Sequence, residues 1–217
     1  MEYTGTKKKI LDVSLDLFSK YGYEATSISQ IADAVGMKKA SLYSHFESKQ
    51  DIFDSLIKVV TEHYEENSIF AQVDWNNPDE DHSRFKDMTP EEIAESVVRF
   101  ISFTVHDPEV SRIRKLFTLE QFQNSELSAM AEKRSYQDLM DYHTGLMKYL
   151  IANNVLKEGN PELMALQYMA PVSMQIYRMD RNPDCEEEAM RLIEKHTIQF
   201  FRQNKKHSEE IINIMST

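Results

Sequence analysis

The chain has 217 residues, of which 41% are apolar and 28% are charged, and it contains 5 glycines, 6 prolines and a single cysteine. This composition is typical of an ordered, mostly helical globular protein and argues against a disordered chain or a disulfide-stabilised secreted one. Because no apolar run approaches the roughly 18 residues of a membrane span and no apolar signal segment follows the first residues, we expect a cytoplasmic protein.

The net charge of −11 is spread unevenly along the chain. Residues 1–50 contain 7 lysines and 6 acidic residues, which leaves 18 of the 25 basic and 30 of the 36 acidic residues for 51–217. The first segment is therefore nearly neutral with clustered lysines, whereas the second carries a net charge of −12. Such an asymmetry is compatible with a local anion-binding face on an otherwise acidic protein.

Apolar residues recur at helical spacing from near the start of the chain. The spacing predicts a first helix over residues 7–20, which Gly22 is placed to end, and a second helix that opens with a capping box of Ser27 and Gln30. Gly36 then permits a sharp turn. The inward faces of these helices are expected to consist of Ile10, Leu11, Ser14, Leu15 and Phe18, and of Ile28, Ile31, Ala32 and Val35.

Two more helices are expected before the first long loop. A third, short helix is expected over residues 38–45, and Ser48 followed by Asp51 opens a fourth. The polar, acidic segment over residues 73–88 has no helical period, and it predicts a loop.

The remainder of the chain is also helical in pattern. Thr89-Pro90 and Asp107-Pro108 each combine an N-cap residue with a first-turn proline, which marks a helix start. No segment keeps the two-residue alternation of a strand for long, so the predicted fold class is all-α. Further helices are expected over residues 108–123, 127–153, 161–178 and 185–203, and Pro171 should kink the third of these.

The second and third helices, joined by the tight turn at Gly36 and packed on a longer first helix, have the sequence form of a helix-turn-helix. The second helix of such a motif fits the major groove of DNA, which requires small or hydrogen-bonding residues on its outer face and cations at its rim. A solvated corner of a helical bundle would explain the same pattern. The outer face would present Lys38, Lys39, Ala40, Ser41 and Ser44, while Met37, Leu42 and Phe46 fall at core spacing.

At these residues the chain resembles a known family. The segment over residues 10–53 resembles the DNA-binding domain of the TetR family of bacterial transcription regulators, and the run LYSHFESKQDIF is the most specific part of the likeness. The resemblance implies an N-terminal three-helix helix-turn-helix domain over residues 1–50, joined by a fourth helix to a larger helical bundle over residues 51–217 that binds a ligand and dimerises. It further implies a homodimeric repressor of a pseudo-palindromic operator in double-stranded DNA, which a small-molecule effector releases.

The resemblance also implies roles for individual residues. Tyr43, His45 and Lys49 would contact phosphates, and the residues nearest the bases would be Lys39, Ala40, Ser41 and Ser44. The complete set expected at DNA is Ser27, Gln30, Lys38, Lys39, Ala40, Ser41, Tyr43, Ser44, His45 and Lys49.

Two departures from the family pattern bear on DNA recognition. Lys38 stands where the family often has Ser or Thr, so the third helix gives up an N-cap worth about 1 kcal/mol and gains a cation. Residues 1–83 contain no arginine, which removes the bidentate contact to guanine. We therefore expect modest direct contacts to bases and an appreciable dependence on DNA shape and deformability.

The C-terminal half holds two apolar stripes that could pack against their mates in a dimer, or could equally be internal core. They consist of Leu163, Met164, Met169, Val172 and Ile176, and of Met190, Ile193, Thr197, Phe200 and Phe201. For the effector, the resemblance implies a mostly apolar small molecule with a polar group. The residues expected at its pocket are Phe100, Phe103, His106, Phe117, Tyr142 and Tyr168.

Motifs for other chemistry are missing from the sequence. Its 7 histidines show no metal-ligand spacing, its 5 glycines are too far apart for a nucleotide-binding loop, and no hydrolase motif can be written. We therefore expect no catalytic residues, no metal, no cofactor and no enzymatic activity. The alternative is a helical small-molecule-binding or catalytic protein whose helix-turn-helix is only structural.

Overall fold

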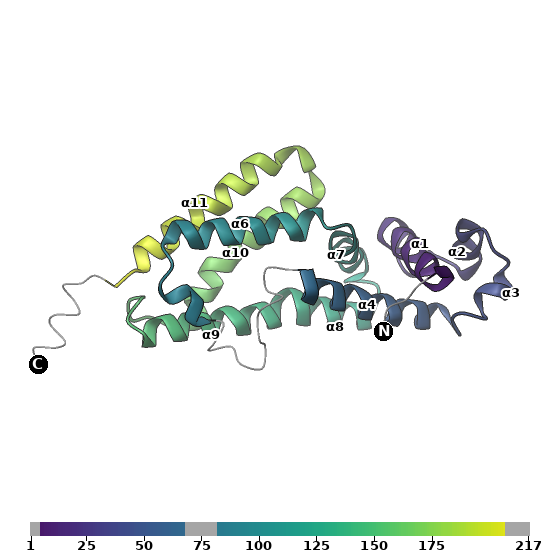
Figure 1. Ribbon diagram of the computed structural model, residues 1–217, viewed down its shortest axis with the longest axis horizontal. Helices are drawn as coiled ribbons and strands as arrows, with labels where there is room; N and C mark the ends of the chain where they lie inside the picture. Colours follow the sequence, from purple (N-terminus) through teal and green to yellow (C-terminus); the bar gives the residue numbers. More distant parts are fainter. Residues whose placement is uncertain (1–4, 68–81, 207–217) are drawn as a thin grey trace, which may run out of the picture. The chain divides into compact units, whose positions relative to one another are not determined.

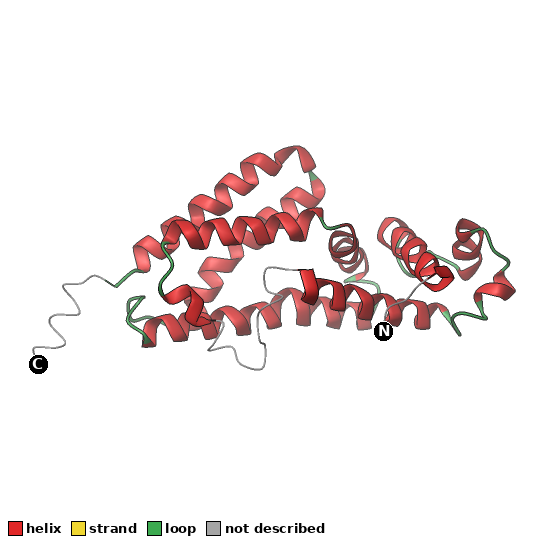
Figure 2. Cartoon of the chain, in the orientation of Figure 1, coloured by secondary structure: helices red, strands yellow, loops and turns green. Residues whose placement is uncertain are grey.

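A computed structural model describes residues 5–67 and 82–206 of the chain. Most of the loop expected over residues 73–88, and the tail from residue 207 onward, lie outside these described residues. Within them the chain consists of helices joined by turns (Figure 2), and β-type pairing is limited to one isolated bridge between Leu156 and Lys205. The predicted all-α fold class is therefore confirmed.

The chain divides into two compact units, and neither is a single stretch of sequence. Within the described residues, the first unit combines 5–67 with 106–132, and the second combines 82–105 with 133–206. The boundary that the sequence suggests at residue 50 does not separate these units, because one uninterrupted helix passes through it and a later helix packs on the first. A division of functions at residue 50 stays a prediction.

The first unit is built on the helix-turn-helix. Its core is formed by the apolar faces predicted for the first two helices, together with residues from the fourth helix and from residues 113–127. The helices, labelled in Figure 1, are α1 (Gly5–Tyr21), α2 (Ile28–Val35), α3 (Lys39–Leu42), α4 (Lys49–Asn67), α7 (Pro108–Glu120) and α8 (Ser125–Glu132).

Local capping explains where α2 and α4 begin. The Gln30 amide N–H donates to Ser27 Oγ, and the Gln30 side chain accepts from the Ser27 amide, so the predicted capping box is formed. At α4, the Asp51 amide donates to Ser48 Oγ at 3.0 Å, as the sequence predicts. Gly36 ends α2 in the left-handed conformation, with φ +84°.

Helix α3 is shorter than the predicted span of residues 38–45. It covers four residues, and its N-cap, Lys38, makes no side-chain capping hydrogen bond. Beyond Leu42 the backbone continues through tight turns, in which the Ser44 amide donates to the Ser41 carbonyl and the His45 amide to that of Leu42. The missing cap and this change of hydrogen-bond register account for the difference.

Helix α7 is fixed within the first unit at its N-terminus. Asp107 caps it by accepting hydrogen bonds from the amides of Glu109 and Val110, and its second oxygen lies 2.7 Å from Nε2 of His63 on α4. Burial by itself would raise the pKa of Asp107, but the hydrogen bonds from Val110 and His63 outweigh it and hold the pKa below its usual value. The charged carboxylate therefore ties α7 to α4.

The second unit is a bundle of longer helices, in which α10 packs against both α9 and α11 (Figure 1). One helix expected over residues 127–153 proves to be α8, a π-helical turn and α9. Pro171 lies inside α10, and its predicted kink is not tested. The elements are η1 (Arg84–Lys86), α6 (Pro90–His106), the π-helical turn η2 (Lys133–Gln137), α9 (Asp138–Ala152), α10 (Pro161–Arg181), η3 (Pro183–Cys185) and α11 (Glu186–Asn204).

Over residues 5–67 and 82–206, no helix combines the length and the apolar character that crossing a membrane needs.

Candidate nucleic-acid interface

The helix-turn-helix presents α3 on a fixed support. Leu42 and Phe46 are 0% and 2% exposed, and they anchor α3 and the following turn in the core of the first unit. The Met37 amide donates to the Ala32 carbonyl across Gly36, which fixes the angle between α2 and α3. Since the apolar side of α3 is buried, its other side faces outward.

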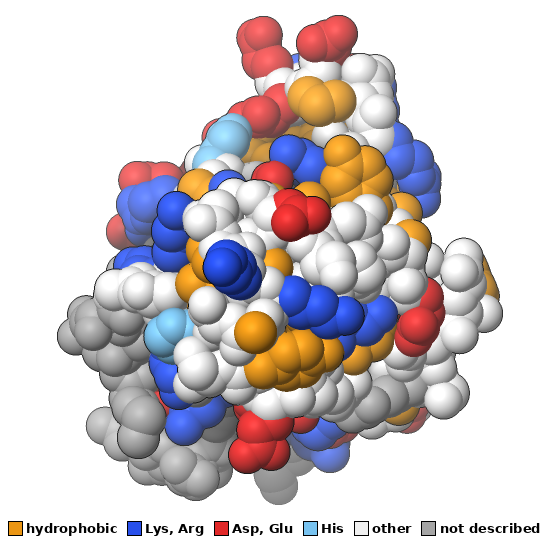
Figure 3. Space-filling view, turned by 90° about the vertical axis from the view of Figure 1, so that its right-hand side faces the viewer, with side chains coloured by type: hydrophobic (Ala, Val, Ile, Leu, Met, Phe, Trp, Pro, Cys, Tyr) orange, Lys and Arg blue, Asp and Glu red, His pale blue; other side chains and the backbone are white. Residues whose placement is uncertain are grey.

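The residues predicted to contact DNA lie on the surface of this motif. Eight of the ten are exposed, and His45 and Lys49 are half-buried. In the space-filling view of the end that carries α3, basic side chains lie among uncharged and apolar ones, and acidic side chains are also present on this face (Figure 3). The sequence from Lys38 to Phe46 includes two lysines and no acid, so this surface suits a polyanion.

Some of these polar groups already have partners within the chain. Ser27 and Gln30 are hydrogen-bonded to each other in the capping box of α2. The Ser44 hydroxyl donates to the Ser41 carbonyl at 2.6 Å, which closes the turn after α3. These three side chains therefore have a structural role whether or not DNA is present.

Two lysines near the N-terminus of α1 contact the helix-turn-helix. Lys9 Nζ donates to the carbonyl of Val35 at 2.8 Å, at the negative end of the α2 dipole. Lys7 Nζ lies 5.4 Å from the centre of the Phe46 ring. The N-terminal lysines therefore add positive charge to the motif itself.

Lys49 differs from the other predicted phosphate contacts because its ammonium group points inward. Its Nζ donates to the carbonyl of Tyr23 at 2.8 Å and lies 4.2 Å from the centre of the Tyr23 ring. A phosphate contact by Lys49 would require the ammonium to give up or share these interactions.

The six residues expected at an effector pocket are not brought together. Phe117 lies in the core of the first unit, and His106 is exposed at the end of α6. Phe100 packs against a separate cluster around Ile101 and Met179 in the second unit. Tyr142 on α9 and Tyr168 on α10 are buried, and of the six they are the pair that one aromatic cluster joins.

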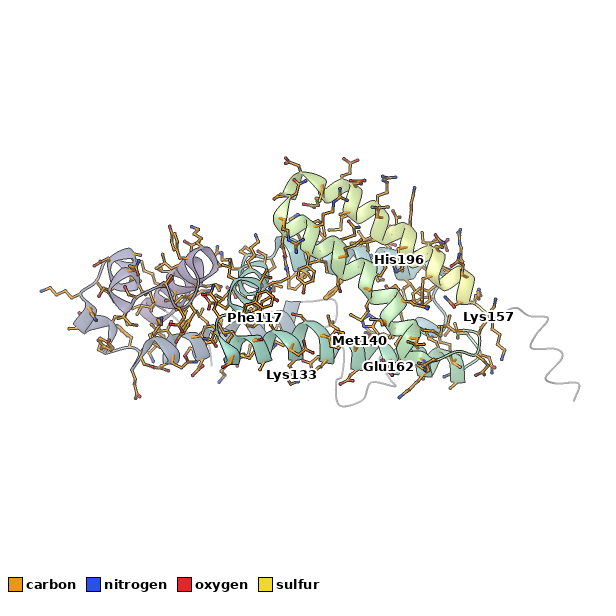
Figure 4. All side chains as sticks on the ribbon, turned by 180° about the vertical axis from the view of Figure 1, so that it is seen from behind. Phe117, Lys133, Met140, Lys157, Glu162 and His196 are labelled. Carbon is orange, nitrogen blue, oxygen red and sulfur yellow. The ribbon has the colours of Figure 1, made fainter. Side chains whose placement is uncertain are left out.

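That aromatic cluster includes three of the 7 histidines, which lie far apart in the sequence. The His143 ring lies 5.1 Å from Tyr142 and 5.6 Å from Tyr168, and the His196 ring stacks on Tyr168 at 5.8 Å. His82 completes it, with its ring 5.1 Å from that of Tyr142. Figure 4 labels His196 on α11 and Met140 on α9, two of the helices that contribute to the second unit's core. Local sequence patterns could not have joined residues from four segments.

Burial sets the protonation of His143 and Tyr168. It lowers the pKa of His143 to about 4, against a smaller opposing effect of its hydrogen bond with the Leu139 carbonyl. It raises the pKa of Tyr168 to about 12. At neutral pH the cluster therefore offers a neutral His143 and a protonated Tyr168.

A separate groove of about 690 Å³ lies on the surface of the second unit, and none of the six expected pocket residues lines it. Its floor crosses α11 and the start of α6, where Arg202 forms an ion pair with Glu91. It is lined by Glu91, Lys195, Ile198, Gln199, Arg202 and Gln203.

The proposed dimer stripes are largely internal. Met164, Ile193, Thr197, Phe200 and Phe201 are buried, and Met169, Val172, Ile176 and Met190 are half-buried. Leu163, in contrast, is exposed, and it begins a different stripe on α10. That stripe recurs at intervals of three and four residues and consists of Leu163, Leu166, Ala170, Met174 and Tyr177, all exposed.

Known proteins share sequence similarity with the N-terminal segment. Residues 10–56 match the family model for bacterial regulatory proteins of the tetR family. Over 52 residues the chain is 48% identical to IcaR of Staphylococcus aureus, described as the HTH-type negative transcriptional regulator of the biofilm operon icaADBC. This match covers 24% of the chain and 28% of IcaR, so the likeness to this relative is confined to the DNA-binding segment.

Solved structures extend the likeness of fold over almost the whole chain. SmeT, the repressor of the Stenotrophomonas maltophilia multidrug efflux pump SmeDEF, aligns with a TM-score of 0.64 at 15% identity, covering 94% of this chain and 93% of SmeT. AibR in complex with isovaleryl coenzyme A and operator DNA aligns with a TM-score of 0.60 at 18% identity, covering 88% and 96%. At these identities the comparison establishes the fold alone.

Proposed function

Because residues 10–56 match the family model for bacterial regulatory proteins of the tetR family, we propose that the chain is a DNA-binding transcriptional repressor of this family. In this proposal it acts in the cytoplasm, without enzymatic activity, as a homodimer on a pseudo-palindromic operator, and a small molecule releases it. The observation that carries the proposal is the surface of α3 and the turn after it, which is exposed, basic and free of acids.

The recognition chemistry follows from the residues on that surface. Lys38 and Lys39 would contact phosphates at the rim of the major groove, with Lys39 also close to the bases, while Ala40 and Ser41 would face the bases and Tyr43 a phosphate. Lysine and serine are less selective than an arginine pair, so sequence-dependent DNA shape would supply part of the specificity.

The dimer would form through the stripe on α10 that begins at Leu163. Exposed apolar side chains at intervals of three and four residues leave one side of α10 without a partner in the described monomer. A second copy would cover it by helix packing, which is the usual way such a stripe is buried. Leu192 on α11 is also exposed and would extend the contact.

The ligand would be recognised at the aromatic cluster of the second unit, which contains Tyr142, His143, Tyr168 and His196. The neutral His143 ring donates from Nδ1 to the Leu139 carbonyl, which leaves its Nε2 to accept a hydrogen bond, and Tyr142, Tyr168 and His196 supply aromatic faces. This chemistry suits a largely apolar molecule with one polar group. AibR is known in complex with both isovaleryl coenzyme A and operator DNA, which supports a role of this fold in combining the two functions.

Salt dependence of DNA binding tests the proposal. If Lys39 contacts a phosphate in each protomer, Lys39→Ala should reduce the slope of log K against log salt by nearly 2, at about 0.9 per lost contact. Lys58→Ala is the matched control, because Lys58 is exposed on α4 and pairs with Glu62 at 3.9 Å. Equal slopes for both variants would place Lys39 away from the DNA and would contradict the proposed interface.

A further inference from the structure

Glu120, the last residue of α7, is a buried acid in the core of the first unit. It is 3% exposed, and its Oε1 accepts a hydrogen bond of 2.7 Å from the amide of Tyr23, which lies 97 positions earlier in the chain. Its Oε2 has no hydrogen-bond partner within the described residues. Burying a carboxylate with one oxygen unsatisfied is costly, so such a group calls for a role that an apolar side chain could not fill.

The backbone around Tyr23 is shaped to receive this carboxylate. Gly22 has φ +91°, and a Cβ at that position would lie 2.5 Å from Glu120 Oε1. Glycine therefore allows both the turn after α1 and the close approach of the carboxylate. The contact between the Glu120 carboxylate and the Tyr23 amide is therefore part of the structure of the turn between α1 and α2.

Tyr23 also contacts the first residues of α4. Its carbonyl accepts from Lys49 Nζ at 2.8 Å, and its hydroxyl donates to Gln50 Oε1 at 2.8 Å. Its ring packs on Phe18 and Phe53, with centroid distances of 5.3 and 5.2 Å. Lys49 and Gln50 follow directly after the turn that ends α3.

We infer that Glu120 is a positioning residue for DNA recognition. By holding the Tyr23 amide it fixes the turn between α1 and α2, and through Tyr23 it fixes Lys49 and Gln50, and with them the segment that presents α3. The end of α7 thereby becomes a point from which the geometry of the helix-turn-helix can be altered. This inference rests on the proposed DNA-binding function.

The test uses the full-length protein and two variants. Glu120→Leu removes the acceptor and keeps an apolar volume, whereas Glu120→Gln keeps an oxygen that can accept from Tyr23. Both should remain folded, as judged by circular dichroism and thermal melting. On a duplex selected by the wild type, Glu120→Leu should weaken binding about tenfold, and Glu120→Gln should stay within about twofold.

A second readout does not depend on DNA. By hydrogen–deuterium exchange, Glu120→Leu should speed exchange in peptides covering residues 22–27 and 38–50 and leave α10 and α11 unchanged. Combining Glu120→Leu with Lys49→Met should weaken binding by much less than the product of the single effects, because both act through Tyr23. A purely stabilising role of Glu120 would instead lower the melting temperature while leaving the affinity and the exchange of residues 38–50 unchanged.

The outcomes separate this inference from the proposed function. A wild type that selects no DNA, with the expected exchange pattern in Glu120→Leu, would overturn the function and keep the positioning role of Glu120. A wild type that selects DNA, with unchanged affinity and exchange in Glu120→Leu, would overturn the inference alone. If the wild type selects no DNA and Glu120→Leu leaves hydrogen–deuterium exchange unchanged, both the proposed function and the inference are overturned.

Discussion

Gly22 and Gly36 both adopt left-handed backbone conformations, with φ of +91° and +84°. They differ in their surroundings, because a Cβ at Gly22 would meet Glu120 Oε1 at 2.5 Å, while one at Gly36 would have nothing within 4 Å. The two positions therefore separate the cost of the backbone conformation from the cost of crowding.

We expect Gly36→Ala to lower the free energy of unfolding by about 1–2 kcal/mol, which is the cost of a left-handed residue with a side chain. Gly22→Ala should cost distinctly more, because the same strain is joined by displacement of the Glu120 carboxylate. Urea denaturation of both variants measures the difference. Equal losses of unfolding free energy in the two variants would mean that the Glu120 carboxylate can move away from Tyr23 without a measurable cost in stability.

His143 makes stability depend on pH. Its pKa is lowered to about 4 in the folded protein, while the unfolded chain titrates near the ordinary value of 6.5. Between these values the unfolded state binds more protons than the folded state. The contribution of His143 to the free energy of unfolding is therefore fully present above pH 6.5 and is lost as the pH falls toward 4. The loss is at most about 3 kcal/mol, at 1.36 kcal/mol per pKa unit.

Denaturation of wild type and His143→Gln at pH 7 and pH 5 measures this contribution. The variant should lose less stability than the wild type on going to pH 5, since its side chain does not titrate. The same loss in both proteins would assign the pH dependence to other groups.

At the level of secondary structure, local capping signals in the sequence located the starts of five helices. The starts of α2, α4, α6, α7 and α10 follow side-chain caps at Ser27, Ser48, Thr89, Asp107 and Asn160. Two predictions were wrong at places where no such signal exists. Helix α3 lacks a side-chain cap and is short, and the π-helical turn at residues 133–137 has no local marker that would divide one expected helix into parts.

The missing cap of α3 leads to a prediction. Lys38→Ser should supply the cap and raise the free energy of unfolding by about 1 kcal/mol, or somewhat less. It should also reduce the salt dependence of DNA binding if Lys38 contacts a phosphate. Lys38→Ala is the control, because it removes the charge without adding a cap. Thermal melting that does not distinguish the two variants would mean that α3 gains nothing from a capped start.

For the whole molecule, the sequence predicted the class of fold and the exposed helix-turn-helix, because both depend on periodicity and short motifs. It could not predict partners distant in the chain. Glu120 lies inside the helix expected over residues 108–123 and no role was predicted for it, yet it is buried against Tyr23. The C-terminal stripes were selected for apolar character alone, and most of their residues face the interior of the second unit.

The exposed stripe on α10 makes the proposed dimer testable. Leu166→Glu should shift the protein toward monomer in sedimentation at micromolar concentrations, because each protomer would bring a charge into the apolar contact. Leu119→Glu is the matched control, since Leu119 on α7 is similarly exposed, at 47% against 41% for Leu166. If both variants sediment like the wild type, the dimer contact does not include this part of α10.

Sequence-specific recognition of DNA by α3 is the central claim, and selection of bound sequences from random duplex DNA tests it most directly. With the purified wild-type protein at physiological salt, we predict enrichment of an inverted repeat whose half-sites lie about one helical turn, or a multiple of it, apart. Lys39→Ala should abolish or strongly weaken that enrichment. A pool that stays unenriched with folded, ligand-free protein would contradict the account and would favour a helical ligand-binding protein whose helix-turn-helix is structural.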